Sequence, residues 1–64
     1  MKYSEMESIE SGLRFKTISG ISVETTGQTE FVESTEVYVH EVKIVEGVGE
    51  GNTYLYNLDT AEQT

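Results

Sequence analysis

From Leu13 onward, most apolar residues of this 64-residue chain alternate with polar ones. An alternation with a period of two places apolar side chains on one face of a β-strand. Glycine and other turn-forming residues interrupt the pattern at short intervals, as they do in antiparallel sheets built from hairpins. The sequence therefore predicts a mainly β protein with about five antiparallel strands over residues 13–58.

The first residues follow a different pattern, with apolar side chains three and four positions apart. Ser4 and Glu7 have the spacing of a capping box, and Gly12 is placed to end a helix in the left-handed conformation. We therefore expect a short helix over residues 4–11. Two turns of helix are marginally stable in water, so this helix should pack on the sheet.

The first hairpin is expected to turn within a three-residue loop at 19–21. Such a loop pairs Thr17 with Val23 and Lys16 with Glu24. This register places the apolar side chains on one face and an ion pair on the other. Because register follows the buried face, we prefer it to a two-residue loop.

Two further turns are expected, at 27–28 and at 34–35. A glycine at the first position suits a two-residue hairpin loop, and it pairs Val23 with Val32. The second turn leads into the longest strand, residues 36–45.

In the longest strand, the apolar residues change from one face to the other at the middle. Val37 and Val39 share one parity, whereas Val42 and Ile44 share the other. A β-bulge at 40–41 would bring all four to one face and bend the strand, as a small barrel requires. The alternative is a regular strand with two half-buried faces, one covered by the helix and one by a dimer partner.

The remaining segments complete a single domain over residues 1–64. Residues 46–52 have the composition of a loop, residues 53–58 read as the last strand, and residues 59–64 as a frayed tail. A helix followed by five short strands favours a small SH3-like or similar barrel. With no cysteine and one histidine, no disulfide or thiolate zinc site can stabilise it.

The charge of the chain limits its partners. Twelve Asp and Glu residues against four Lys and Arg give a formal net charge of −8. Nucleic-acid binding depends largely on Lys and Arg that neutralise phosphates, so direct nucleic-acid binding is disfavoured. A salt-rich habitat would also fit the charge, because salt screens the repulsion between surface carboxylates.

No feature of the sequence indicates a membrane or an exported protein. A membrane-spanning helix needs about 20 apolar residues, and the chain contains no such run. The first residues lack the cationic start of a signal peptide. We therefore expect a cytoplasmic protein that makes no membrane contact.

Few residues could support catalysis or hold a cofactor. His40 lies within a strand, where a structural or surface role is usual. The glycine-rich loop 47–51 contains a glutamate and precedes a strand, whereas phosphate-binding loops open a helix. We therefore expect no enzymatic activity, no cofactor and no metal site.

Composition and pattern favour a small acidic domain that binds another protein or a second copy. Phe31, Tyr38 and Val45 fall on the outer face of the predicted barrel, where exposed apolar side chains mark interfaces. With Tyr54 and Tyr56 they form the candidate interaction surface. The alternative is an acidic inhibitor that mimics nucleic acid and occupies a basic nucleic-acid-binding protein.

Overall fold

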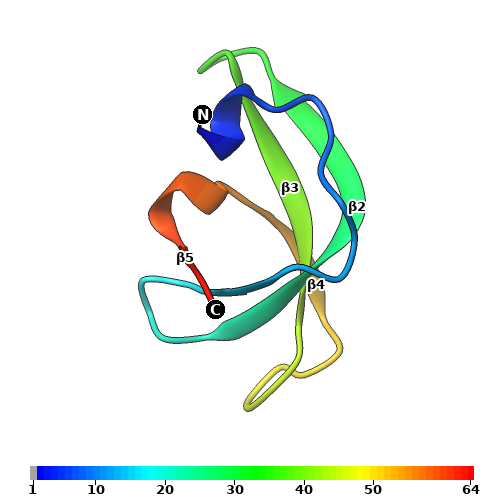
Figure 1. The fold of residues 1–64 in the computed structure, drawn as a ribbon, viewed down its shortest axis with the longest axis vertical. Helices are drawn as coiled ribbons and strands as arrows, with labels where there is room; N and C mark the ends of the chain where they lie inside the picture. The colour runs from blue at the N-terminus through cyan, green and yellow to red at the C-terminus, as the bar shows by residue number, and fades with distance from the viewer. Residues whose placement is uncertain (1) are drawn as a thin grey trace.

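A computed structural model describes residues 2–64 as one five-stranded antiparallel sheet with two 3-10 turns (Figure 1). The elements are η1 (Tyr3–Glu5), β1 (Arg14–Lys16), β2 (Ser22–Val32), β3 (Val37–Ile44), β4 (Thr53–Tyr56), η2 (Leu58–Thr60) and β5 (Glu62–Gln63). The strand order is β4-β3-β2-β1-β5, so the last strand returns to pair with the first. The prediction of a mainly β protein with five antiparallel strands is confirmed.

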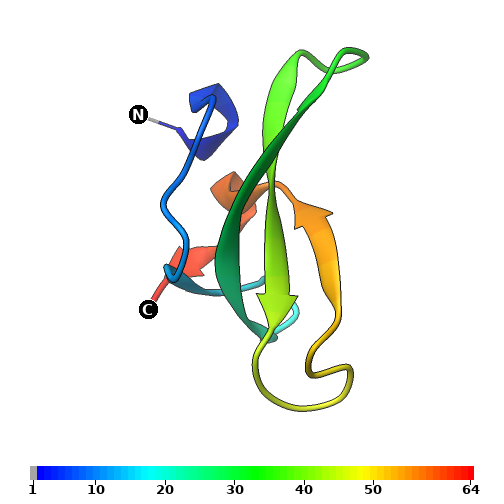
Figure 2. The same ribbon diagram turned by 90° about the vertical axis from the view of Figure 1, so that its right-hand side faces the viewer.

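The sheet is open, and the prediction of a closed SH3-like barrel is wrong. β4 and β5 form the two edges and do not pair with each other in the described chain. Closure would require these edges to share a ladder, but β4 has four residues and β5 has two. The sheet instead twists strongly along the length of β2 and β3, and β1 pairs only with the start of β2 (Figure 1, Figure 2).

The predicted N-terminal helix over residues 4–11 is absent, and the end of this segment hydrogen-bonds to β2 instead. The Gly12 N–H donates to the Thr25 carbonyl at 2.8 Å, and the Thr25 N–H donates to the Leu13 carbonyl at 2.9 Å. The Thr25 hydroxyl donates to the Glu10 carbonyl at 2.6 Å. The segment before β1 is thereby held in an extended path alongside β2.

The only helical elements among residues 2–64 are the two 3-10 turns η1 and η2. Neither is long and apolar enough to cross a membrane.

The first hairpin keeps the predicted faces but shifts its register by two residues. Phe15 pairs with Val23, whereas the predicted loop would have paired Thr17 with Val23. The loop keeps three residues but moves to 18–20, because the Thr17 N–H donates to the Ile21 carbonyl at 2.9 Å. A shift of two leaves every side chain on its expected face, and Phe15 and Val23 are both buried.

The shift changes the ion pair across this hairpin. Glu24 lies opposite Arg14, and Arg14 Nε is 3.4 Å from Glu24 Oε1. Lys16, the predicted partner of Glu24, lies opposite Ser22 on one side and Glu62 of β5 on the other.

β2 continues through the predicted turn at 27–28, so the prediction of a hairpin there is wrong. Its register with β3 shifts between Thr25 and Thr29, and three residues of β2 oppose Glu41 alone. Gly27 has a φ of 94°, a left-handed value that a bulge accommodates as well as a turn does. As a result, Val32 does not pair with Val23.

The predicted bulge at 40–41 lies at the right level of the sheet but on the wrong strand. β3 is continuous from Val37 to Ile44, and the extra residues belong to β2. His40 and Val42 therefore share the core face, and both are fully buried. Val37 and Val39 fall on the opposite face and are half-buried.

The apolar core is small and lies between the β1–β2–β3 part of the sheet and η2. Its fully buried members are Phe15, Val23, Val42 and Leu58. Leu58 was predicted to end the last strand, but β4 stops at Tyr56 and Leu58 opens η2.

Residues 59–64 were expected to form a frayed tail, but they carry most of η2 and all of β5. β5 pairs with β1, with Gln63 opposite Phe15. The C-terminal segment thus completes the sheet beside the core. The predicted loop at 46–52 is confirmed, since no strand or helix interrupts it.

Replacing Gly27 with Ala tests the bulge. The left-handed conformation costs a residue with a Cβ about 1–2 kcal/mol, so we expect the free energy of unfolding to fall by about that amount. Urea denaturation measures it, with Gln28→Ala as the control, because Gln28 is exposed beside Gly27. A loss no larger than that of the control would contradict this account of the bulge.

Candidate interaction surface

The ends of β2 and β3 beyond the bulge form a hairpin arm, defined as residues 30–39. The turn of this arm lies at one end of the molecule, away from the core (Figure 1, Figure 2). Val32 pairs with Val37 and closes a turn over residues 33–36, which includes the predicted turn at 34–35. Glu36 holds a left-handed φ of 55° within this turn.

Phe31 and Tyr38 form a cross-strand pair on the arm. They lie directly opposite each other, with ring centroids 5.0 Å apart and ring planes tilted by 57°. Phe31 is 48% exposed and Tyr38 is half-buried. By strand alternation they share the face of His40, so they extend the core face rather than occupy the predicted outer face.

The other predicted surface residues lie elsewhere. Tyr54 and Tyr56 stand on β4 with ring centroids 5.9 Å apart and pack against the core. Burial, and then the neighbouring Tyr56, raise the pKa of the Tyr54 hydroxyl. Val45 follows the far end of β3, where its N–H donates to the Ser22 carbonyl at 3.1 Å. The structure therefore brings Phe31 and Tyr38 together and keeps Val45 apart from them.

Charge is distributed unevenly between the arm and the rest of the protein. Each cation lies near a carboxylate outside the arm: Lys2 near Asp59, Arg14 beside Glu24, Lys16 in register with Glu62 and Lys43 in register with Glu24. The arm carries Glu30, Glu33 and Glu36 and contains no Lys or Arg. Within residues 2–64 none of these three carboxylates forms a side-chain hydrogen bond or an ion pair.

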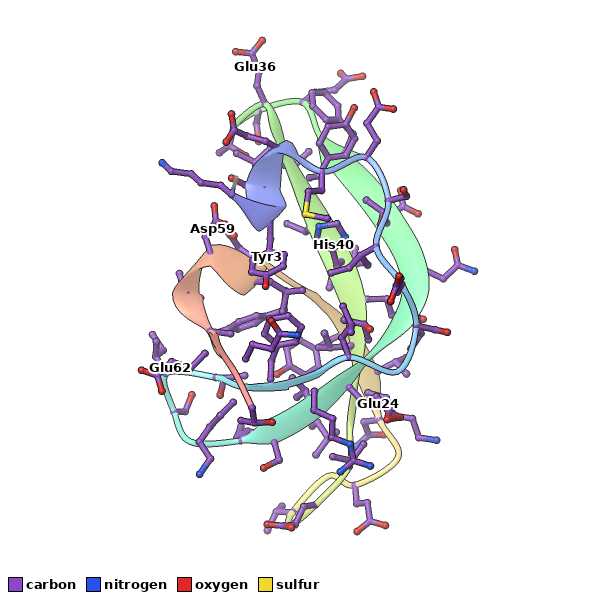
Figure 3. The ribbon with its side chains drawn as sticks, in the orientation of Figure 1. Tyr3, Glu24, Glu36, His40, Asp59 and Glu62 are labelled. Carbon is purple, nitrogen blue, oxygen red and sulfur yellow. The ribbon has the colours of Figure 1, made fainter. Side chains whose placement is uncertain are left out.

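Tyr3 connects segments that lie far apart in the sequence, and sequence analysis did not identify this role. Its ring packs edge-on against Phe15 with centroids 5.2 Å apart. Its N–H donates to Asp59 Oδ1 at 2.7 Å, and its hydroxyl donates to Gln63 Oε1 at 3.3 Å. Its carbonyl accepts from His40 Nε2 at 2.9 Å, and Figure 3 shows Tyr3 between His40 and Asp59.

Asp59 caps η1 from the opposite end of the chain. Its carboxylate accepts from the N–H groups of Tyr3 and Ser4 at 2.7 and 3.3 Å, and also from the Ser4 hydroxyl. The hydroxyl bond, the two backbone bonds and nearby Lys2 lower the pKa of Asp59, although partial burial acts in the opposite direction. Ser4 was predicted to cap a helix as an acceptor, but here it donates.

His40 is a structural residue of the core. It is fully buried, and both ring nitrogens have partners. Because the Tyr3 carbonyl can only accept, Nε2 carries a hydrogen and donates it. Nδ1 forms a hydrogen bond with the Thr29 hydroxyl at 2.8 Å. Neither nitrogen is exposed to a substrate.

Two shallow grooves flank η2. The first, of about 380 Å³, is lined by Lys16, Thr17, Ile18, Gly20, Thr60 and Glu62. The second, of about 400 Å³, is lined by Lys2, Tyr3, Leu58, Asp59 and Ala61. Residues 2–64 contain no group of three His, Cys, Asp or Glu residues placed to hold a metal ion.

No protein-family model, curated protein or solved structure matches the chain. A functional proposal must therefore rest on the exposed aromatic pair and the charge distribution of the chain itself.

Replacing Asp59 with Asn tests the cap of η1. A carboxyl whose pKa is lowered on folding stabilises the fold above its ordinary pKa, and this contribution disappears as the pH falls through the lowered value. We expect Asp59→Asn to lower the free energy of unfolding by roughly 0.3–1 kcal/mol at neutral pH, because the negative charge at the start of η1 is lost. The difference from the wild type should shrink as the pH falls below the ordinary pKa of 3.8 and vanish only below the lowered pKa.

Urea denaturation between neutral pH and pH 2 measures this effect. Glu50→Gln is the control, because Glu50 is exposed and forms no side-chain hydrogen bond within residues 2–64. A destabilisation by Asp59→Asn that stays constant across this pH range would contradict the proposed cap.

Replacing His40 with Leu tests the buried hydrogen bonds. The Tyr3 carbonyl and the Thr29 hydroxyl would both lose a partner, so we expect a loss of about 2 kcal/mol or more. Adding Thr29→Val should recover part of that loss, because it removes the hydroxyl that His40→Leu leaves without a hydrogen-bond partner. Equal stability of His40→Leu and the wild type in urea would refute the structural role.

Proposed function

We propose that this protein is a small non-enzymatic domain that binds another protein through the arm. The observation that carries the proposal is the Phe31–Tyr38 pair, which is partly exposed at the end of a hairpin. Aromatic side chains are enriched at protein interfaces, and large exposed ones mark binding surfaces. Tyr38 also offers a hydroxyl for hydrogen bonding at the interface rim.

The backbone of the arm is already paired as a β-ladder without a partner. It continues the two longest strands, both of which enter the core. Cross-strand pairs run from Glu30 opposite Val39 to Val32 opposite Val37. Because these strands already fix the backbone, binding would not require the arm to fold, and the entropy cost of association is correspondingly lower.

Self-association is the second form of the proposal. Contact between two arms would bring their six glutamates together without a cation between them, and like charges oppose such contact. This dimer should therefore form only where salt screens the carboxylates. Sedimentation velocity at low and at molar salt tests it, and a monomer under both conditions excludes it.

Direct nucleic-acid binding is not part of the proposal. It would need cations that are free to neutralise phosphates. All four cations of the chain lie beside carboxylates on the core half of the fold. A phosphate backbone would therefore meet these cations with carboxylates close by, which weakens its attraction to them.

Replacing Phe31 and Tyr38 together with Ser tests the arm. Both changes lie beyond the core, so circular dichroism should show a folded protein. Proteins retained from cells of its source by the immobilised full chain should fall by about tenfold or more with this variant, because aromatic residues dominate interface energies. Quantitative mass spectrometry measures the retained proteins.

Ile18→Ser with Val48→Ser is the matched control. These two side chains are more exposed than Phe31, at 82% and 100%, but they lie in loops at other parts of the fold. If the two double variants retain the same proteins as the wild type, the arm is not the binding surface.

A further inference from the structure

We infer that the partner presents a Lys- or Arg-rich protein segment to the arm, with a cationic side chain against Phe31 and Tyr38 and its neighbours beside the arm's carboxylates. This inference rests on the proposed function, because it names the chemistry of the partner that the arm binds. Two features of the arm support it: the arm contains glutamates but no Lys or Arg, and its aromatic pair is partly exposed.

The separation of charge identifies the sign of the partner. All four cations lie near carboxylates of the core half, and the arm holds three glutamates with no cation among residues 30–39. The arm is therefore an acidic part of the surface with no cation of its own. The field of such a surface attracts a basic partner and speeds its diffusional encounter.

The position of the glutamates relative to the rings identifies the kind of contact. Glu33 follows Phe31 by two residues and Glu36 precedes Tyr38 by two, so the turn that joins the two strands carries a carboxylate at each of its ends. Figure 3 shows Glu36 at the end of the molecule and directed away from the fold. A basic segment that reaches the rings would thus meet carboxylates at the adjoining turn.

The aromatic pair supplies a surface that a cation can use. A ring face attracts an ammonium or guanidinium group that lies within about 6 Å of its centroid. The planar guanidinium of Arg also stacks on aromatic faces, whereas Lys acts as a point charge. Phe31 is half-exposed, so one ring of the pair is open to such a group. An Arg-rich segment should therefore bind more tightly than a Lys-rich one.

A second copy of the chain fits this surface poorly. It carries the same net charge of −8, and its own cations already lie beside carboxylates. A contact between copies would add repulsion without supplying a free cation. The observations therefore favour a basic partner over self-association.

The test compares two charge variants that remove the same number of charges. Glu30→Gln, Glu33→Gln and Glu36→Gln neutralise the arm, whereas Glu46→Gln, Glu50→Gln and Glu62→Gln neutralise three exposed carboxylates elsewhere. The probes are fluorescent octa-arginine and octa-lysine peptides, added to the full chain and followed by anisotropy. We expect the arm variant to weaken octa-arginine binding by about tenfold and the control by about threefold or less, since only the arm combines charge with rings.

Two further measurements locate the contact. Amide chemical shifts in the presence of octa-arginine should change mainly within residues 30–39. Phe31→Leu with Tyr38→Leu keeps apolar side chains but removes the ring faces, so it should weaken octa-arginine binding and abolish the preference over octa-lysine. Together these results would show that charge and rings act at one site.

Equal weakening by the two charge variants, or shift changes spread over the whole surface, would overturn the inference. Such results would show general electrostatic attraction instead of a site. The proposed function would survive them if the Phe31→Ser, Tyr38→Ser variant still lost proteins that the Ile18→Ser, Val48→Ser control retained. If that comparison also showed no difference, both proposals would fail.

Discussion

The hydrogen bond from His40 Nε2 to the Tyr3 carbonyl connects the start of the chain to the centre of the sheet. Tyr3 also reaches Asp59 through its N–H and Phe15 through its ring, so the two ends of the chain and the central strands meet at one residue. The fully buried apolar core has four residues. In so small a core, this polar network fixes which segments pack together, while apolar burial supplies the driving force.

The sequence pattern predicted which residues share a face of the sheet better than it predicted where the helix, the turns and the bulge lie. Alternation placed Phe15 and Val23 on one face even though the register differed by two, because the period of a strand is two. Helical spacing failed for residues 4–11, since the end of this segment bonds to Thr25 of β2, a long-range contact that local spacing does not contain. The bulge was misplaced because a pattern within β3 cannot show which of two paired strands holds the extra residues.

The candidate surface was predictable only in part, because the pairing between strands cannot be read from the sequence pattern. Phe31 and Tyr38 were chosen as leftover apolar residues, and their pairing depends on a register that only the fold shows. Tyr54 and Tyr56 have the same sequence signal but pack on the core. The sequence also does not show which carboxylate lies near each cation. Lys16 and Glu62, for example, lie opposite each other only because β5 returns to pair with β1. The charge of the arm therefore had to be read from the three-dimensional arrangement.

The open edge at β4 has a consequence for how the protein stays dispersed. β4 is paired with β3 alone, and its sequence Thr-Tyr-Leu-Tyr contains no charge, proline or glycine. Edge strands are ordinarily protected by such residues, because an unprotected edge can recruit a strand from another molecule. Mutual repulsion between molecules of charge −8 opposes such recruitment. That repulsion weakens as the pH approaches the isoelectric point near 4.3.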